Sequence, residues 1–167
     1  MISKKMETAI NQQINLEIFS AHMYLQMSAY FSSRNLNGFA HWFRLQYQEE
    51  LVHAGKLFDH VLMRDGNVKL TAVAAPTQTW KSTLAACEAA YNAEVKNTKQ
   101  INALMDAATK ENDHATRVIL QWFVEEQVEE ESSAMNLVEQ VKLTENAAGA
   151  ILILDRELGG RTPDAGE

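Results

Sequence analysis

Two stretches decide the fold: residues 48–60, QEELVHAGKLFDH, and residues 120–131, LQWFVEEQVEEE. In the first, Glu50 lies seven residues after Phe43, and His53 lies one helical turn further on. Residues three, four or seven apart share one face of an α-helix, and here that face is apolar. The pattern therefore predicts a helix that directs a carboxylate and an imidazole into the core.

The same layout occurs a second time in the chain. Glu17 precedes Glu50 by 33 residues, and Glu94 precedes Gln127 by 33 residues. Glu50-x-x-His53 on the second helix thus matches Gln127-x-x-Glu130 on the fourth. Two helical hairpins packed about a pseudo-two-fold axis would bring six groups to one level of a bundle: Glu17, Glu50, His53, Glu94, Gln127 and Glu130.

Helical periodicity predicts four long helices: at about residues 4–33, at about 39–64, from beyond residue 79 or 82 to about 110, and from beyond residue 113 to about 143. A short fifth helix is predicted at about 146–158. Thr79 or Ser82 is expected to cap the third helix, and residues 159–167 form a polar tail. Residues 66–79 have no helical period and include Pro76. Most connections in bundles have about 2–8 residues, so this longer one indicates a crossover between parallel helices. We therefore expect an all-α single domain over residues 1–167: a four-helix bundle with one long crossover between its second and third helices.

The composition narrows the class of function. The 167 residues are 46% hydrophobic with 7 Gly and 2 Pro, which suits a compact helical domain. A net charge of −7 attracts cations and disfavours nucleic acid and anionic membranes. Cys87 is the one cysteine, the N-terminus has no signal-peptide pattern, and no apolar stretch could span a bilayer. These features favour a cytoplasmic protein.

Buried carboxylates at one level call for cations. Four buried Glu side chains would repel one another and take up protons unless divalent ions neutralise them. Carboxylates with imidazole suit iron or manganese and do not suit a thiolate-type zinc site. Taken singly, each Glu is more often a boundary residue, His53 a hydrogen-bonded core histidine, and residues 125–131 a solvated helix face. The joint pattern on four helices favours a two-metal site.

The chain resembles the ferritins, and bacterial non-haem ferritins in particular, from Met6 to about Leu158. The segments that carry the resemblance are NLEIFSAHMYLQMSAYF (residues 15–31), AAYNAEV (residues 89–95) and the two stretches quoted above. The resemblance implies that Glu17, Glu50 and His53 hold the first iron of a ferroxidase centre. Glu50 would bridge to a second iron held with Glu94 and Glu130.

The resemblance also implies roles for groups around the two irons. Gln127 would form hydrogen bonds beside the pair, and Tyr24 would lie next to the first iron, although an ordinary core tyrosine is the alternative. A third iron site would use Glu49, Glu126, Glu129 and Glu130. Solvated surface acids are the alternative reading of that last set.

The function implied by the resemblance is iron storage: Fe(II) is oxidised by O2 or H2O2, and ferric mineral is deposited inside a shell of 24 subunits. The apolar fifth helix, with Ile151 to Leu154, supports assembly. No haem is expected, because Leu51 stands where bacterioferritins carry a haem-binding methionine, and Gln127-x-x-Glu130 replaces their second Glu-x-x-His. The mini-ferritins that protect DNA lack the fifth helix and bind their irons between subunits.

Two other classes of protein are alternatives. A peroxidase of the rubrerythrin type would also use a di-iron bundle, but such proteins usually add an iron domain with four cysteine ligands, and this chain has only Cys87. A helical scaffold without metal is the second alternative. Anaerobic Fe(II) titration separates these classes.

Overall fold

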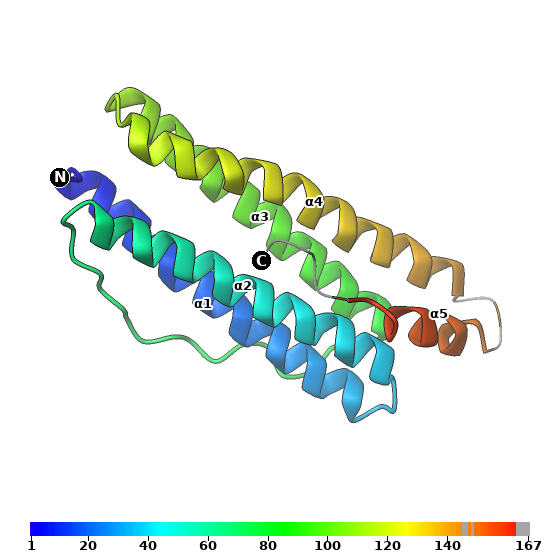
Figure 1. Cartoon of the computed structure of the whole chain (residues 1–167). Coiled ribbons are helices and arrows are strands. Elements are labelled where there is room, and N and C mark those ends of the chain that lie inside the picture. Colours follow the sequence, from blue (N-terminus) through cyan, green and yellow to red (C-terminus); the bar gives the residue numbers. More distant parts are fainter. Residues whose placement is uncertain (145–146, 148, 163–167) are drawn as a thin grey trace.

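The computed structural model describes residues 1–144, 147 and 149–162, and these residues form five α-helices and no strand (Figure 1). The bounds are α1 Lys4–Ser32, α2 Asn37–Met63, α3 Thr83–Lys110, α4 His114–Thr144 and α5 Ala150–Leu158. The prediction of an all-α bundle with a short C-terminal helix is confirmed. Within the described residues, no helix combines the length and apolarity that a bilayer span requires.

The four long helices form two antiparallel hairpins, α1 with α2 and α3 with α4. Figure 1 shows the segment between α2 and α3 running back along the outside of the α1–α2 hairpin. Because the chain returns along the full helix length, α2 and α3 run in the same direction. The predicted long crossover is confirmed, and Ser82 caps α3 by accepting a hydrogen bond from the Ala85 N–H at 3.0 Å.

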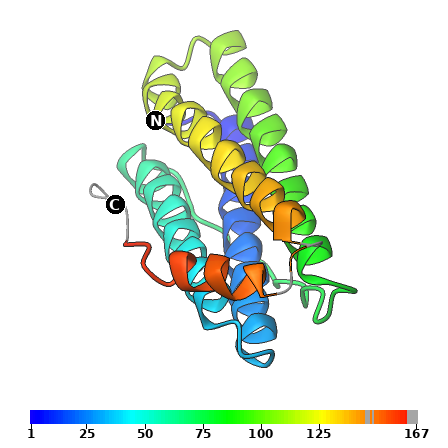
Figure 2. The same cartoon turned by 90° about the vertical axis from the view of Figure 1, so that its right-hand side faces the viewer.

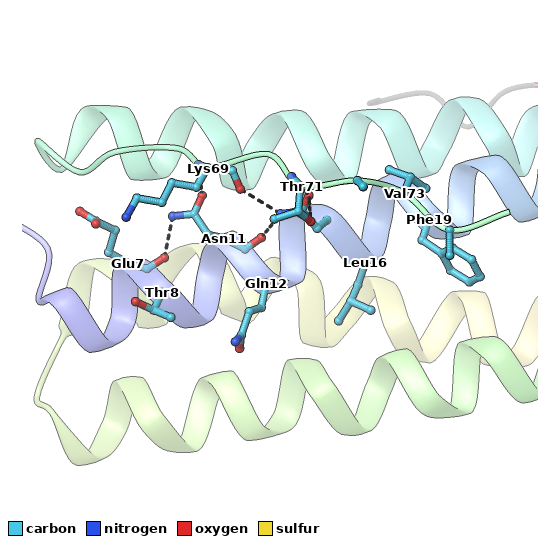
Figure 3. Close-up of a pocket in the computed structure, with 12 residues that line it drawn as sticks. Glu7, Thr8, Asn11, Gln12, Leu16, Phe19, Lys69, Thr71 and Val73 are labelled. Carbon is cyan, nitrogen blue, oxygen red and sulfur yellow. Dashed lines mark hydrogen bonds between the residues drawn. The ribbon is translucent and has the colours of Figure 1, made fainter. Parts of the chain in front are cut away.

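The crossover is held by side chains of α1 that stand one turn apart (Figure 3). Asn11 accepts from the Lys69 N–H at 2.6 Å and donates to the Asn67 carbonyl at 2.9 Å. Asn15, one turn later, accepts from the Thr71 N–H at 2.8 Å. Four helical residues rise about 6 Å, and two extended residues span about 6.6 Å, so the two repeats stay in register. The crossover thus satisfies these backbone groups without a partner strand.

Two apolar clusters lie at opposite ends of the bundle. The cluster near the α1–α2 turn contains Phe31, Phe39 and Phe43, whose rings stack with centroids 5.0 to 5.2 Å apart. The other cluster includes Ile10 from α1 and Phe123 from α4. The polar residues predicted to break each apolar stripe lie between the clusters, at mid-height of the bundle. Both clusters therefore exclude water from the central level on either side.

Helix α5 crosses the bundle steeply at the beginning of α2 (Figure 2). Asp155 Oδ1 accepts hydrogen bonds from the Gly38 and Phe39 N–H groups at 2.8 and 3.0 Å, so it caps α2. A Cβ on Gly38 would lie 1.5 Å from the Asp155 carbonyl oxygen, which is why glycine is required there. The fifth helix was predicted from about residue 146 and begins at Ala150. Residues 145, 146, 148 and 163–167, and with them part of the predicted polar tail, lie outside the described residues.

Candidate metal centre

The six groups predicted from the repeated spacing are all buried, and they come from all four long helices. Glu17 lies on α1, Glu50 and His53 on α2, and the remaining three on α3 and α4. The exposed fraction of these residues is 7% for Glu130 and at most 2% for the others. A surface role is therefore excluded for each member of the set.

Glu17, Glu50 and His53 each offer one ligand atom, and these atoms lie within 4.8 Å of one another. Glu50 Oε2 lies 3.6 Å from His53 Nδ1, which is beyond hydrogen-bond distance. Among the described residues this buried oxygen has no hydrogen-bond partner. A buried carboxylate oxygen without a donor is costly, and coordination of a cation removes that cost. The donor set of two carboxylates and an imidazole fits a redox-active divalent metal.

The opposite side of the level is held by Glu94 on α3. Both of its carboxylate oxygens are engaged: Tyr24 donates from its hydroxyl to Oε1, and Gln127 donates from Nε2 to Oε2 at 3.3 Å. Gln127 thus forms a hydrogen bond to one of the buried carboxylates. Tyr24 is fully buried, and its ring stacks on Phe43 with centroids 6.0 Å apart. The tyrosine therefore joins the polar level to the adjacent apolar cluster.

Burial and mutual repulsion govern the charge state of the carboxylates. Burial, followed by the charges of Glu17 and Glu94, raises the pKa of Glu50 well above its ordinary value. Burial also raises the pKa of Glu130 well above the ordinary value, with Glu94 and Glu49 adding to the effect. The pKa of Glu94 is raised by burial, and hydrogen bonds from Tyr24 and Gln127 oppose this. Without a cation, the level therefore retains protons at a pH where exposed glutamates are ionised.

Sequence reasoning missed two buried amides that orient the ligands. Gln13 donates to Glu17 Oε1 at 2.7 Å, and Asn97 donates to Glu17 Oε2 at 3.2 Å. Asn97 also accepts from Gln13 at 2.6 Å and donates to Gln127 Oε1 at 3.3 Å. The available signal was positional: Gln13 is four residues before Glu17, and Asn97 is three after Glu94, so each shares a face with a carboxylate.

Glu130 is one of the six central groups and is also expected at the third iron site, with Glu49, Glu126 and Glu129. One ligand atom from each of His53, Glu126 and Glu130 falls within a common 4.8 Å limit. Glu126, Glu129 and Glu130 line a groove of about 420 Å³, and Glu129 is exposed. Glu49 is 4% exposed, and its Oε1 accepts from Arg161 Nη2 at 2.9 Å. The structure therefore groups three of these acids at the groove and pairs Glu49 with a basic side chain.

A larger groove, of about 590 Å³, lies elsewhere, between α1 and the crossover (Figure 3). Its walls include Leu16, Phe19 and Val73, and its one acidic residue, Glu7, is paired with Lys4. It lacks the converging carboxylates and imidazole of the central level. Chemistry, rather than size, marks the central level as the candidate site.

The fold and the site together define a class of protein: four-helix bundles with a buried layer of carboxylates and imidazole suited to take up metal. A ferritin-like domain matches residues 7–144 of the chain. The chain belongs to the ferritin family, and this membership supports a role in iron storage.

Individual relatives agree with this assignment over nearly the whole chain. The chain is 39% identical to a bacterial non-heme ferritin of Bacteroides fragilis over 161 residues, which is 96% of this chain and 100% of that protein. It is 34% identical to a bacterial non-heme ferritin of Staphylococcus aureus, over 98% of this chain and 99% of that protein. Among solved structures, an open-pore ferritin from the archaeon Archaeoglobus fulgidus is 51% identical, with a TM-score of 0.95 over 97% of this chain and 100% of that chain.

Proposed function

We propose that the chain is a ferritin subunit that binds two Fe(II) ions at its central level, oxidises them and delivers Fe(III) for storage as mineral. The observation that carries the proposal is Glu50, a fully buried carboxylate whose Oε2 has no hydrogen-bond partner among the described residues and faces His53 and Glu17. Within the described residues, no hydrogen bond uses this oxygen, so it is available to a cation. It is suited to bridge two cations.

Each side chain then has a defined task. Glu17, Glu50 and His53 bind the first Fe(II), and Glu50 extends to the second, which Glu94 and Glu130 also bind. Four carboxylates balance the charge of two divalent ions, so the filled level is close to neutral. Gln127 and Tyr24 keep the Glu94 carboxylate in place through their hydrogen bonds. Trp122 and Phe123 pack edge-on against the His53 ring and fix its orientation.

The proposed reaction is a two-electron oxidation. Each Fe(II) gives up one electron, and O2 accepts both with two protons to form H2O2. With H2O2 as oxidant, two electrons and two protons give two molecules of water. The pair of sites at one level lets both electrons pass in a single encounter with the oxidant, which favours a two-electron product over a one-electron radical.

We further propose that the chain works as a homo-oligomer, with 24 subunits enclosing the mineral. Leu152 and Ile153 on α5 are 61% and 65% exposed, although α5 is one of the most apolar segments of the chain. Neighbouring exposed apolar residues favour burial against another subunit. A rubrerythrin-type peroxidase is the alternative to storage, and a particle no larger than a dimer by size-exclusion chromatography would favour it.

Anaerobic Fe(II) titration followed by mixing with O2 tests the centre. The wild-type protein should bind two Fe(II) per chain tightly and oxidise them rapidly. Glu50→Ala should bind fewer and lose the fast phase, whereas Glu88→Ala, at an exposed position on α3, should behave as wild type. If Glu50→Ala oxidises Fe(II) at the wild-type initial rate, the centre is assigned wrongly. Absence of tight binding in the wild type would favour a scaffold without metal.

A further inference from the structure

Arg161, just beyond α5, places a guanidinium beside the acids of the third cluster, which consists of Glu49, Glu126, Glu129 and Glu130. Its Nη2 donates to Glu49 Oε1 at 2.9 Å, and its Nη1 donates to Gln46 Oε1. The arginine side chain is 20% exposed and the Glu49 side chain 5% exposed, so solvent screens this ion pair less than a surface pair. The contact joins the C-terminal end of the described chain to the middle of α2.

Two further contacts hold Arg161 in position along α2. His41 Nε2 donates to the Arg161 carbonyl oxygen at 2.9 Å. The guanidinium carbon lies 5.4 Å from the centroid of the Trp42 ring, a distance at which a cation is attracted to the ring face. Gln46, which accepts from Arg161, donates in turn to Glu130 Oε2 at 2.7 Å. Arg161 is thus linked to Glu49 directly and to Glu130 through one amide.

Arg161 lies at the groove where a third cation would bind. Arg161 lines the same groove as Glu126, Glu129 and Glu130. A divalent ion there would be repelled by the guanidinium and would have to share Glu49 with it. The Arg161 guanidinium therefore places a positive charge of the protein at the third cluster before any metal binds.

We infer that Arg161 is a tethered cation that competes with metal for Glu49 and keeps the third cluster a weak site. The inference rests on the proposed function only in that the third cluster is taken to bind metal at all. A weak third site would pass ions onward, whereas the central pair holds them long enough to react. A third ion that uses Glu49 would have to share this carboxylate with Arg161, which weakens the contact between the C-terminal segment and α2.

Isothermal titration of the assembled protein with Zn(II), which has no redox chemistry, tests the inference. In the wild type we expect two tight steps and a weak third step. Arg161→Gln should tighten the third step about 10- to 100-fold and leave the first two unchanged. Arg161→Lys, which keeps the charge, should stay near wild type. Arg156→Gln, which removes a charge at an exposed position of α5, is the matched control and should also stay near wild type.

Each possible result of the titration either supports or overturns the inference about Arg161. An unchanged third step in Arg161→Gln overturns the inference, and a weakened one shows instead that Arg161 orients Glu49 for the metal. Should Arg161→Gln fail to assemble, Arg161→Met keeps an apolar stem against Trp42 without the charge and must give the same tightening. If the wild type shows no tight steps, the proposed di-iron centre is wrong. The inference about Arg161 would still be supported if weak Zn(II) binding became tighter in Arg161→Gln than in wild type.

Discussion

Asn97 on α3 donates a hydrogen bond to Glu17 on α1, with 3.2 Å between Nδ2 and Oε2. Since Gln13 holds the other oxygen of the same carboxylate, Glu17 has a fixed orientation before any metal arrives. Outer hydrogen bonds of this kind commonly set metal affinity. In the proposed centre, Asn97 would orient a metal ligand although it offers none itself.

The first prediction concerns Asn97→Ala. Without its amide, the Glu17 carboxylate can rotate, and the first metal should bind about 10- to 100-fold more weakly. Zn(II) calorimetry measures the effect. Asn92→Ala, an exposed position on the same helix, is the control and should match wild type. Equal affinity in both variants would mean that the fold, not Asn97, orients Glu17.

The second prediction concerns protons released on metal binding. The raised pKa values of Glu50, Glu94 and Glu130 mean that the metal-free centre carries protons that divalent ions must displace. At mildly acidic pH, the apparent enthalpy of Zn(II) binding should differ between two buffers of different ionisation enthalpy. The difference should shrink in Glu50→Ala. Identical enthalpies in the two buffers would mean that the centre is already ionised.

The same shifts fix how the stability of the metal-free protein depends on pH. Folded pKa values above the ordinary 4.5 mean that the folded state binds more protons than the unfolded state. The carboxyl groups with raised pKa therefore contribute their full share to the free energy of unfolding below about pH 4.5. That share is lost as the pH rises through their pKa values in the folded state. Bound metal should remove the loss, so metal should raise the thermal midpoint more at about pH 7.5 than at about pH 5.5.

The third prediction concerns His60 at the far end of α2. Burial, together with the charge of Arg64, lowers its pKa from 6.5, and its Nε2 lies 3.0 Å from the Thr116 hydroxyl. The unfolded chain therefore takes up the proton first, and stability falls as the pH drops below about 6.5. Thermal midpoints between about pH 7.5 and 5 should fall less in His60→Gln than in wild type. His22→Gln, at an exposed position, should follow wild type.

The fourth prediction compares two glycines of α2. A methyl group on Gly55 would meet no neighbouring atom within 4 Å, so Gly55→Ala should stabilise the helix by about 0.5–1 kcal/mol. At Gly38 the same methyl group would collide with the Asp155 carbonyl, push α5 away and weaken the cap, at a cost of about 0.5–2 kcal/mol. Thermal unfolding should shift in opposite directions, and hydrogen exchange in α5 should rise only in Gly38→Ala. A shift of the same sign in both variants would contradict this account.

Much of the fold could be predicted because it depends on local patterns. Helical periodicity located the four long helices, and the length of the segment after residue 64 indicated the crossover. The beginning of α2 was placed two residues late, since Leu36 offers no side-chain cap and the cap comes from Asp155 on another helix. Likewise, Asn11 and Asn15 resemble ordinary polar helix residues until the crossover lies against them.

The six central groups could be predicted because the repeated spacing sets them apart from ordinary surface acids. Gln13, Asn97 and Arg161 could not be predicted in the same way. An amide or a guanidinium is common on any helix or tail, and only contact across helices gives these three their roles. Spacing along the chain indicates which groups converge, whereas their orientation depends on the packed structure.

The cap that Asp155 provides for α2 can form only late in the synthesis of the chain. During synthesis on the ribosome, the α1–α2 hairpin emerges long before residue 155 and must wait with the first turn of α2 incomplete. The helix that carries Glu50 and His53 thus receives its N-terminal cap from a segment that is synthesised more than a hundred residues later. Completion of the subunit fold therefore depends on the synthesis of α5, and a chain that ended before that helix would lack the cap on α2.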